Sequence, residues 1–281
     1  MRDVSEIADV VELQIWARNH PITSSALKAE LEAALGEDEE RAEELAQNVM
    51  DEVQSREVLL KDSYPFTCDG YRVELKHPDA ATTTYLFCLG LSLLPPAEIE
   101  NEQRAIQFET VVLNAARKFF GGDALRIGAP WRSADVPDYG TLLDKVIELI
   151  PNLGQKSKTA APGGGDAGWD VLIVRNFSDN LYPRLIALGN CATGRHDWKR
   201  KGMEVQPTLF WTYFLHAHLS VFITFFAVPF MMDEDARKRK LSSSNLTLDR
   251  LRICEYEPTV MADAATWLAT QRENALNLAI A

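Results

Sequence analysis

Cysteine is scarce in this chain, and the cysteines present are scattered. They are Cys68, Cys88, Cys191 and Cys254. No two of them form a C-x-x-C pair, so the sequence indicates neither a zinc knuckle nor a disulfide framework. The first residues are acidic and lack the apolar core of a secretory signal peptide. These absences predict a reduced, cytoplasmic protein.

Basic side chains are scarce in the first part of the chain. Residues 1–100 carry 21 acidic and 8 basic side chains, whereas residues 101–281 carry 20 acidic and 21 basic ones. The formal net charge of -12 therefore belongs to the first part. Because an acidic surface repels the phosphate backbone of nucleic acid, we expect this part to be structural or to bind a protein partner or a second copy of the chain.

Charged residues are absent from residues 209–232, a run long enough by length alone to span a bilayer. The run contains His216 and His218, and residues 221–229 are rich in β-branched and aromatic side chains, which favour strands. We therefore expect a short apolar helix followed by a buried strand, and no membrane partner.

The first part has the patterns of three helices followed by a β-hairpin. The predicted elements are helices over residues 3–17 and 26–35, a long acidic helix from residue 37, and a hairpin over residues 66–75 with an Asp-Gly turn. This order predicts an acidic, helical, winged-helix-like module over residues 1–96. The Pro95-Pro96 pair is the expected boundary.

The second part, residues 97–281, mixes helices with short apolar strands, which indicates an α/β fold of the mixed α+β kind. The predicted elements are a helix from residue 98 to 120, a helix over residues 142–150, and strands over residues 171–174 and 185–189. Turn-forming residues join the two strands, so the simplest connection is an antiparallel hairpin. That hairpin sets Asp170 and Asn190 side by side, where their oxygens suit a divalent cation.

Two glycine-containing motifs resemble those of a known nuclease family. Residues 165–170, G-D-A-G-W-D, and residues 189–194, G-N-C-A-T-G, are similar to the G-D-G-G-x-D and Q-C-K signature of type IV restriction endonuclease catalytic domains, which belong to the PD-(D/E)xK superfamily. Phe108 and Glu109 resemble the F-E pair of that family's first core helix. The resemblance implies a restriction-endonuclease-like mixed sheet flanked by helices, and hydrolysis of DNA with Mg²⁺ or Mn²⁺.

The resemblance also implies a set of site residues. Asp170, Asn190 and Glu109 are the implied metal ligands and catalytic residues. The chain departs from the family twice, because Asn190 stands where Gln or Glu is usual and Ala192 stands where the lysine is expected. Loss of one positioned electrostatic group typically costs on the order of 10²-fold to 10³-fold in rate, which predicts either a slow enzyme or an inactive one.

A basic residue after the second strand is the expected substitute for the missing lysine. Lys201 is our choice over Lys199, and Arg195 is closer still to the strand in sequence. Asp166, four residues before Asp170, is either a second carboxylate or a turn former.

Two basic clusters in the second part are candidates for contact with nucleic acid phosphates. They consist of Arg195, Lys199, Arg200, Lys201, Arg237, Lys238, Arg239 and Lys240. Strings at residues 64–66, 192–198 and 248–253 resemble uncharacterised bacterial proteins associated with phage-defence loci. The expected function is thus a metal-dependent DNA nuclease of bacterial anti-phage defence. The alternative is a catalytically degenerate nuclease-like domain that acts as a nucleic-acid-binding or assembly subunit.

Overall fold

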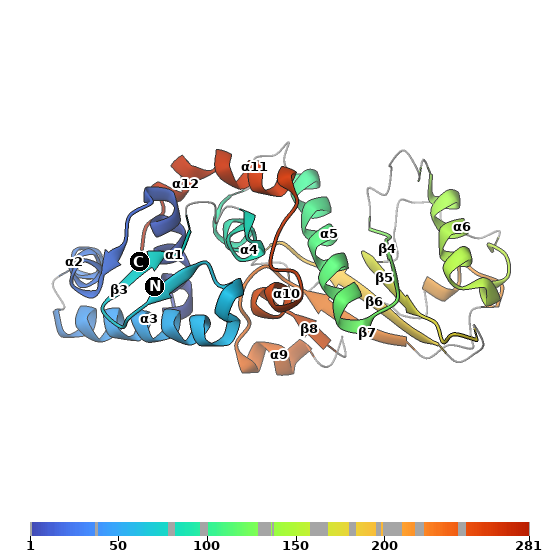
Figure 1. Cartoon of the computed structure of the whole chain (residues 1–281), viewed down its shortest axis with the longest axis horizontal. Coiled ribbons are helices and arrows are strands. Elements are labelled where there is room, and N and C mark those ends of the chain that lie inside the picture. The colour runs from blue at the N-terminus through green and yellow to red at the C-terminus, as the bar shows by residue number, and fades with distance from the viewer. Residues whose placement is uncertain are drawn as a thin grey trace. The chain divides into compact units, whose positions relative to one another are not determined.

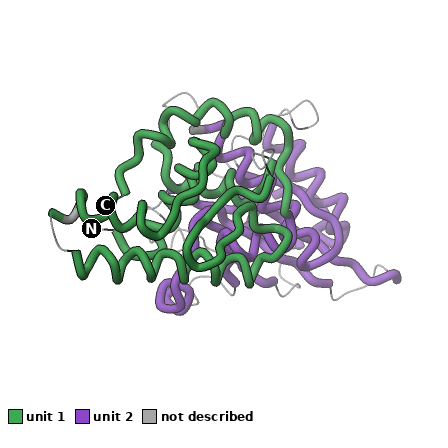
Figure 2. Tube along the Cα trace, turned by 60° about the vertical axis from the view of Figure 1, so that its left-hand side comes forward, with its two compact units in different colours: residues 1–96, 258–281 green, residues 97–257 purple. Residues whose placement is uncertain are grey.

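A computed structural model of the chain describes residues 2–36, 39–77, 82–95, 101–128, 136, 138–157, 168–179, 184–194, 198, 210–216, 222–240 and 246–280. The fold is mixed α/β, with a five-stranded mixed sheet and a small antiparallel sheet. The chain divides into two compact units (Figure 2). Unit 1 combines residues 1–96 with residues 258–281, and unit 2 comprises residues 97–257.

Unit 1 begins with the three helices that the sequence predicts. They are α1 (Val4–Arg18), α2 (Ser24–Leu35) and α3 (Glu39–Leu60). Asp3 and Glu6 form a capping box at the start of α1. The Thr23 side chain caps α2, and Gly36 ends that helix with the left-handed φ that glycine tolerates best. Local capping chemistry therefore fixes the start of α1 and both ends of α2.

A three-stranded antiparallel sheet follows these helices. Its strands are β1 (Ile22–Thr23), β2 (Phe66–Cys68) and β3 (Arg72–Leu75), in the order β1-β3-β2, and the 3-10 turn η1 (Lys61–Ser63) precedes β2. The Asp69 carboxylate accepts hydrogen bonds from the backbone N–H groups of Tyr71 and Arg72 at the tip. The predicted hairpin is confirmed, and β1 is an additional strand that is too short to leave a periodic pattern.

A buried charge network joins α1 to α3. The Arg56 guanidinium lies 2.9 Å from the Asp9 carboxylate and 3.0 Å from the Glu12 carboxylate, and all three side chains are buried. Tyr64 and Tyr85 donate to Glu12 through their hydroxyl groups. Burial opposes the charge on Arg56, but the nearby carboxylates outweigh it and hold the pKa of Arg56 above its usual value. The network explains how charged residues of α1 can face the core.

The C-terminal segment, residues 258–281, packs in unit 1, whereas the sequence pattern predicts a second part that extends over residues 97–281. The segment contains α11 (Ala262–Thr270) and α12 (Arg272–Leu276), which contact α4 (Thr84–Leu93) and α1. Gln14 of α1 donates to the carbonyl oxygen of Leu278 at 2.7 Å, and Phe87 packs edge-on against Trp267. Helix α1 is buried over nearly its whole length, so other elements must pack on more than one of its sides. The C-terminal helices supply part of this packing.

The five-stranded sheet is the frame of unit 2. Its strands are β4 (Asp123–Arg126), β5 (Val171–Arg175), β6 (Leu185–Cys191), β7 (Phe222–Ala227) and β8 (Leu246–Leu248), in that order across the sheet. The first three strands pair antiparallel, and β6, β7 and β8 pair parallel. The predicted hairpin is β5–β6, with Leu172 opposite Leu188.

Helices and loops pack on the sheet of unit 2. Helix α5 (Asn101–Phe120) contacts β4, β5 and β6 and lies across these strands in Figure 1. A separate apolar core contains β5 and β6 residues such as Leu172 and Leu188, together with α6 (Tyr139–Leu149), η4 (Pro151–Leu153) and aromatic residues from 210 to 214. Two further helices in the described part of unit 2 are α9 (Glu234–Lys240) and α10 (Arg250–Tyr256). This packing buries both central strands.

Residues 209–232 include β7, whose last four residues are buried, as expected for a core strand. Gly189 on β6 faces the ring of Phe225 on β7 so closely that an added Cβ would lie 2.1 Å from it. Among the described residues, no helix combines the length and the apolarity needed to cross a bilayer.

Candidate metal site

Asp170 immediately precedes β5, and backbone hydrogen bonds hold it from both neighbouring strands. Its N–H donates to the carbonyl oxygen of Gly189 at 2.8 Å. Its own carbonyl oxygen accepts from Ile127 at 2.8 Å and from Gly128 at 3.1 Å. Two strands therefore fix the backbone of Asp170, so its side chain projects from a rigid position, as a metal ligand requires.

Asn190 lies beside Asp170, as the hairpin predicts. The Asn190 amide nitrogen donates to the carbonyl oxygen of Gly168 at 2.5 Å and to Asp170 Oδ2 at 3.3 Å. The backbone N–H of Cys191 also donates to Asp170 Oδ2, at 2.6 Å. Asn190 is nearly buried, and its Oδ1 has no hydrogen-bond partner among the residues that the structure describes. A buried amide oxygen in this state has spare capacity for a cation.

Glu109 reaches the same site from the middle of α5. A Cβ placed on Gly128 would lie 2.7 Å from Glu109 Oε2 and 2.8 Å from Asp170 Oδ1. The two carboxylates therefore converge beside Gly128, at a position where a side chain on this residue would clash with both of them. Glu109 is 5% exposed and Asp170 is 8% exposed, so this convergence takes place where screening by water is weak.

Arg126, the last residue of β4, is the cation beside these carboxylates. Its Nη1 donates to Glu109 Oε2 at 2.7 Å and to the carbonyl oxygen of Gly128 at 2.9 Å. The ion pair is largely shielded, with side-chain exposures of 17% for Arg126 and 7% for Glu109. An arginine–carboxylate pair in such surroundings is stronger than an exposed one.

The donor set fits a hard divalent cation. Glu109 and Asp170 offer carboxylate oxygens and Asn190 offers an amide oxygen, the ligand types that Mg²⁺ and Mn²⁺ prefer. Mg²⁺ commonly keeps several waters and takes only one or two protein carboxylates. Within the described ranges, no group of three or more His, Cys, Asp or Glu side chains is placed to hold a metal. The candidate site thus depends on the amide of Asn190 as its third protein ligand.

Ala192 is buried among apolar side chains. It is 1% exposed and belongs to a buried cluster. The other members of this cluster are Trp198, Phe226, Val228, Phe230, Met232 and Ala236. A lysine at position 192 would have to place its ammonium group against these side chains or extend past them. The apolar cluster gives a packing reason for an alanine at position 192.

Several predicted site residues lie outside the described part of the chain. They are Asp166, Arg195, Lys199, Arg200 and Lys201. In the second basic cluster, Arg237 pairs with the buried Asp249 at 2.5 Å, and Lys238 pairs with Glu234 at 2.8 Å. These two side chains are thus engaged within the protein. Lys238 and Arg239 are both exposed. Lys240 ends α9.

Arg126 and Gly128 are the site residues that the sequence analysis missed. Strand β4 has only four residues, and none of them is fully buried, so it leaves no apolar run in the sequence. The single available signal is the string Leu125-Arg-Ile-Gly128 after the helix-ending Gly121-Gly122 pair. Only the pairing of β4 with β5 brings these residues to Asp170.

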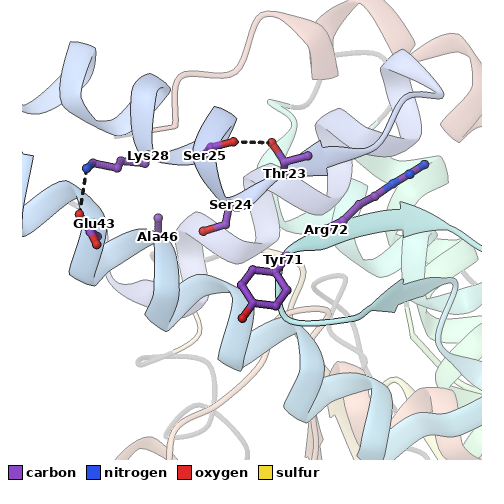
Figure 3. A pocket seen from close by; sticks show the side chains of 8 residues that line it. All are labelled: Thr23, Ser24, Ser25, Lys28, Glu43, Ala46, Tyr71 and Arg72. Atoms are coloured by element: carbon purple, nitrogen blue, oxygen red, sulfur yellow. Dashed lines mark hydrogen bonds and ion pairs between the residues drawn. The ribbon is translucent and has the colours of Figure 1, made fainter.

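Unit 1 contains a separate pocket of about 420 Å³ near the start of α2 (Figure 3). Its lining residues are Thr23, Ser24, Ser25, Lys28, Glu43, Ala46, Tyr71 and Arg72. Lys28 lies 2.9 Å from Glu43 and 3.0 Å from Glu39, and these hydrogen bonds raise the pKa of Lys28 above its usual value. Because the lysine is already paired with glutamates, we place the candidate site in unit 2.

Comparisons of the chain with protein-family models, with curated proteins and with solved structures found no match.

Proposed function

We propose that the chain is a metal-dependent nuclease that hydrolyses DNA phosphodiester bonds, with Mg²⁺ or Mn²⁺ held by Glu109, Asp170 and Asn190. One observation carries this proposal. Two nearly buried carboxylates from different elements converge beside Gly128. The adjacent Asn190 adds an oxygen that no described residue hydrogen-bonds.

The architecture supports the same proposal. The resemblance of residues 165–170 and 189–194 to type IV restriction endonucleases implies a mixed sheet flanked by helices. Unit 2 contains a five-stranded mixed sheet with helix α5 packed on it. We propose that unit 2 is restriction-endonuclease-like. The three helices and small antiparallel sheet of unit 1 likewise support a winged-helix-like module.

The chemistry assigned to the site is assisted hydrolysis of a phosphate diester. A divalent cation supplies charge neutralisation at the phosphate and makes a water molecule more acidic. The chain holds its ligands in place through the β4 and β6 backbone contacts of Asp170 and through the amide of Asn190. Lys201, or else Lys199 or Arg195, keeps its predicted role as the basic group next to the reacting phosphate.

The biological setting is proposed from the sequence strings that resemble phage-defence proteins. Within that setting, unit 2 would act on DNA, and the acidic surface of unit 1 would bind a protein partner or a second copy of the chain. The exposed Glu39 and Glu43 side chains support this division, because they would repel a phosphate backbone.

One observation favours the alternative function. Ala192 is buried in an apolar cluster where the family has a lysine, which is what a domain that has lost catalysis would show. In that case unit 2 would bind nucleic acid or assemble with a nuclease without cutting DNA itself. Under this alternative, unit 2 has the same fold but does not hydrolyse DNA.

A cleavage assay separates these two functions. The full chain is incubated with supercoiled plasmid in Mg²⁺, in Mn²⁺ and in EDTA, together with the variants Asp170→Ala and Asp123→Ala. Asp123 lies on the neighbouring strand β4 and is exposed, so its variant is the matched control. We expect nicking that requires a cation and that is lost in Asp170→Ala only. Absence of nicking in the wild type, or nicking that survives in Asp170→Ala, would defeat the enzyme proposal. DNA binding without nicking would support the alternative.

A further inference from the structure

We infer that Arg126 is the resident counter-cation of the site, that a divalent cation displaces it from Glu109, and that it then pairs with a phosphate of the substrate. The inference rests on the proposed function. It concerns a residue that no sequence motif identified. It also gives the site a positive charge that does not depend on position 192.

Arg126 and a cation at this site compete for one oxygen, Glu109 Oε2. Arg126 Nη1 donates to Glu109 Oε2 at 2.7 Å. That same Oε2 is the atom nearest to the Cβ position of Gly128, where Asp170 Oδ1 also converges. A cation that binds the two carboxylates through the oxygens nearest to Gly128 therefore shares or takes the oxygen that Arg126 holds.

Arg126 and a bound cation would repel each other at Glu109. Two positive charges on one carboxylate oxygen repel each other, and the repulsion is strong where the effective dielectric constant is low. Glu109 is 5% exposed, so water screens this site weakly. Arg126 therefore lowers the affinity of the empty site for a cation, and a bound cation favours the release of Arg126.

Strand pairing, and not the contact with Glu109, holds the backbone of Arg126 in place. In the pairing of β4 with β5, Arg126 lies opposite Val171. Its side chain is 17% exposed and also donates to the carbonyl oxygen of Gly128. A guanidinium group released next to the site has the shape and charge to pair with a phosphate.

The first test measures cation binding without nucleic acid. Mn²⁺ is titrated into the full chain by calorimetry for the wild type, Arg126→Gln, Arg126→Lys and the matched control Arg175→Gln. Arg175 lies on β5 and donates to the carbonyl oxygen of Phe120, away from the carboxylates. We expect Arg126→Gln to bind Mn²⁺ about tenfold more tightly, and the two other variants to stay within about threefold of the wild type.

A second background isolates the role of Glu109. In a Glu109→Gln protein, we expect Arg126→Gln to give no further gain in Mn²⁺ affinity, because the ion pair is already absent. If Arg126→Gln in the protein that retains Glu109 binds Mn²⁺ no more tightly than the wild type does, the inference is overturned and the proposed function stays intact. Failure of both the wild type and Arg126→Gln to bind Mn²⁺ would overturn the proposed metal site and the inference together.

The last test measures whether Arg126 contributes to DNA binding when a divalent cation is present. Binding of a short fluorescent DNA duplex is measured in Ca²⁺, which takes the same oxygen ligands as Mg²⁺, and in EDTA. We expect Arg126→Gln to weaken duplex binding about tenfold in Ca²⁺ and to have less than about twofold effect in EDTA, where Arg126 remains on Glu109. Equal losses in both buffers, or no loss in Ca²⁺, would contradict the exchange of partners.

Discussion

Asn190 orients Asp170 through a side-chain hydrogen bond across the β5–β6 hairpin. Its amide nitrogen lies 3.3 Å from Asp170 Oδ2 and 2.5 Å from the carbonyl oxygen of Gly168. Both partners are acceptors, so the amide group is fixed with its nitrogen toward them. One neutral residue therefore holds a carboxylate in place and keeps an oxygen available. This gives a physical role to the amide at position 190.

The first prediction concerns Asn190→Asp. The new carboxylate cannot donate to Asp170 or Gly168, and it repels Asp170, so we expect the protein to lose about 1–3 kcal/mol of unfolding free energy in EDTA. A divalent cation should restore most of this loss, because it binds between the negative charges. Urea unfolding in EDTA and in Mn²⁺ measures both effects. Asn152→Asp is the control, because Asn152 is exposed and accepts a hydrogen bond from Arg184. An Asn190→Asp protein as stable as the wild type in EDTA would contradict the prediction.

The second prediction concerns Gly128→Ala. The new methyl group lies within 3 Å of the Glu109 and Asp170 carboxylates, where the cation would bind. We expect Mn²⁺ affinity to fall about 10-fold to 100-fold. The fold should survive, because the atoms in the way are the ends of side chains. Calorimetric titration measures the affinity and circular dichroism checks the fold. Gly140→Ala, which approaches Asp138 at 3.0 Å, is the control. Unchanged Mn²⁺ binding by Gly128→Ala would argue against this location for the site.

The sequence was sufficient to predict the parts of the site that depend on local patterns. The turn formers between residues 176 and 183 predict the hairpin, and the hairpin register places Asp170 next to Asn190. Glu109 is different, because α5 is far from β5 in sequence and no local pattern places the helix on the sheet. Only the resemblance to a nuclease family singled out Glu109. Glu109 comes close to Asp170 only through the tertiary packing of α5 on the sheet.

Two other features could not be predicted, for physical reasons. Arg126 lies on a short, half-buried strand whose stability comes from pairing with β5 and not from its own composition. The return of the C-terminal helices to unit 1 depends on the burial of α1 on several sides. Asp9 and Glu12 give that helix a charged face in the sequence, which predicts that this face is exposed. In the structure their carboxylates are buried, and pairing with Arg56 offsets the cost of burying these charges.

The third prediction tests this buried network. Arg56→Ala removes the guanidinium but leaves the Asp9 and Glu12 carboxylates in the core, so we expect a loss of about 3–5 kcal/mol in unfolding free energy. Urea denaturation monitored by circular dichroism measures the loss. Arg72→Ala is the matched control, because Arg72 forms an exposed pair with Glu74, and it should cost at most about 1 kcal/mol. Similar losses in the two variants would show that the buried network contributes little.

The last prediction concerns pH. Burial opposes ionisation of Glu57, but hydrogen bonds from the Cys68 backbone N–H and from Lys76 outweigh it and lower the pKa of Glu57 below its usual 4.5. A carboxyl group whose pKa is lower in the folded state stabilises the protein above its unfolded-state pKa, and this stabilisation is lost as the pH falls through the folded-state value. Glu57→Gln should therefore reduce the dependence of stability on pH below about 4.5. Urea midpoints between pH 3 and pH 7 measure the dependence. Glu30→Gln, which removes the exposed pair with Arg18, is the control. Glu57 of α3 accepts a hydrogen bond from strand β2. If the urea midpoints of Glu57→Gln fall with decreasing pH as steeply as those of the wild type, other carboxyl groups govern the acid unfolding of unit 1.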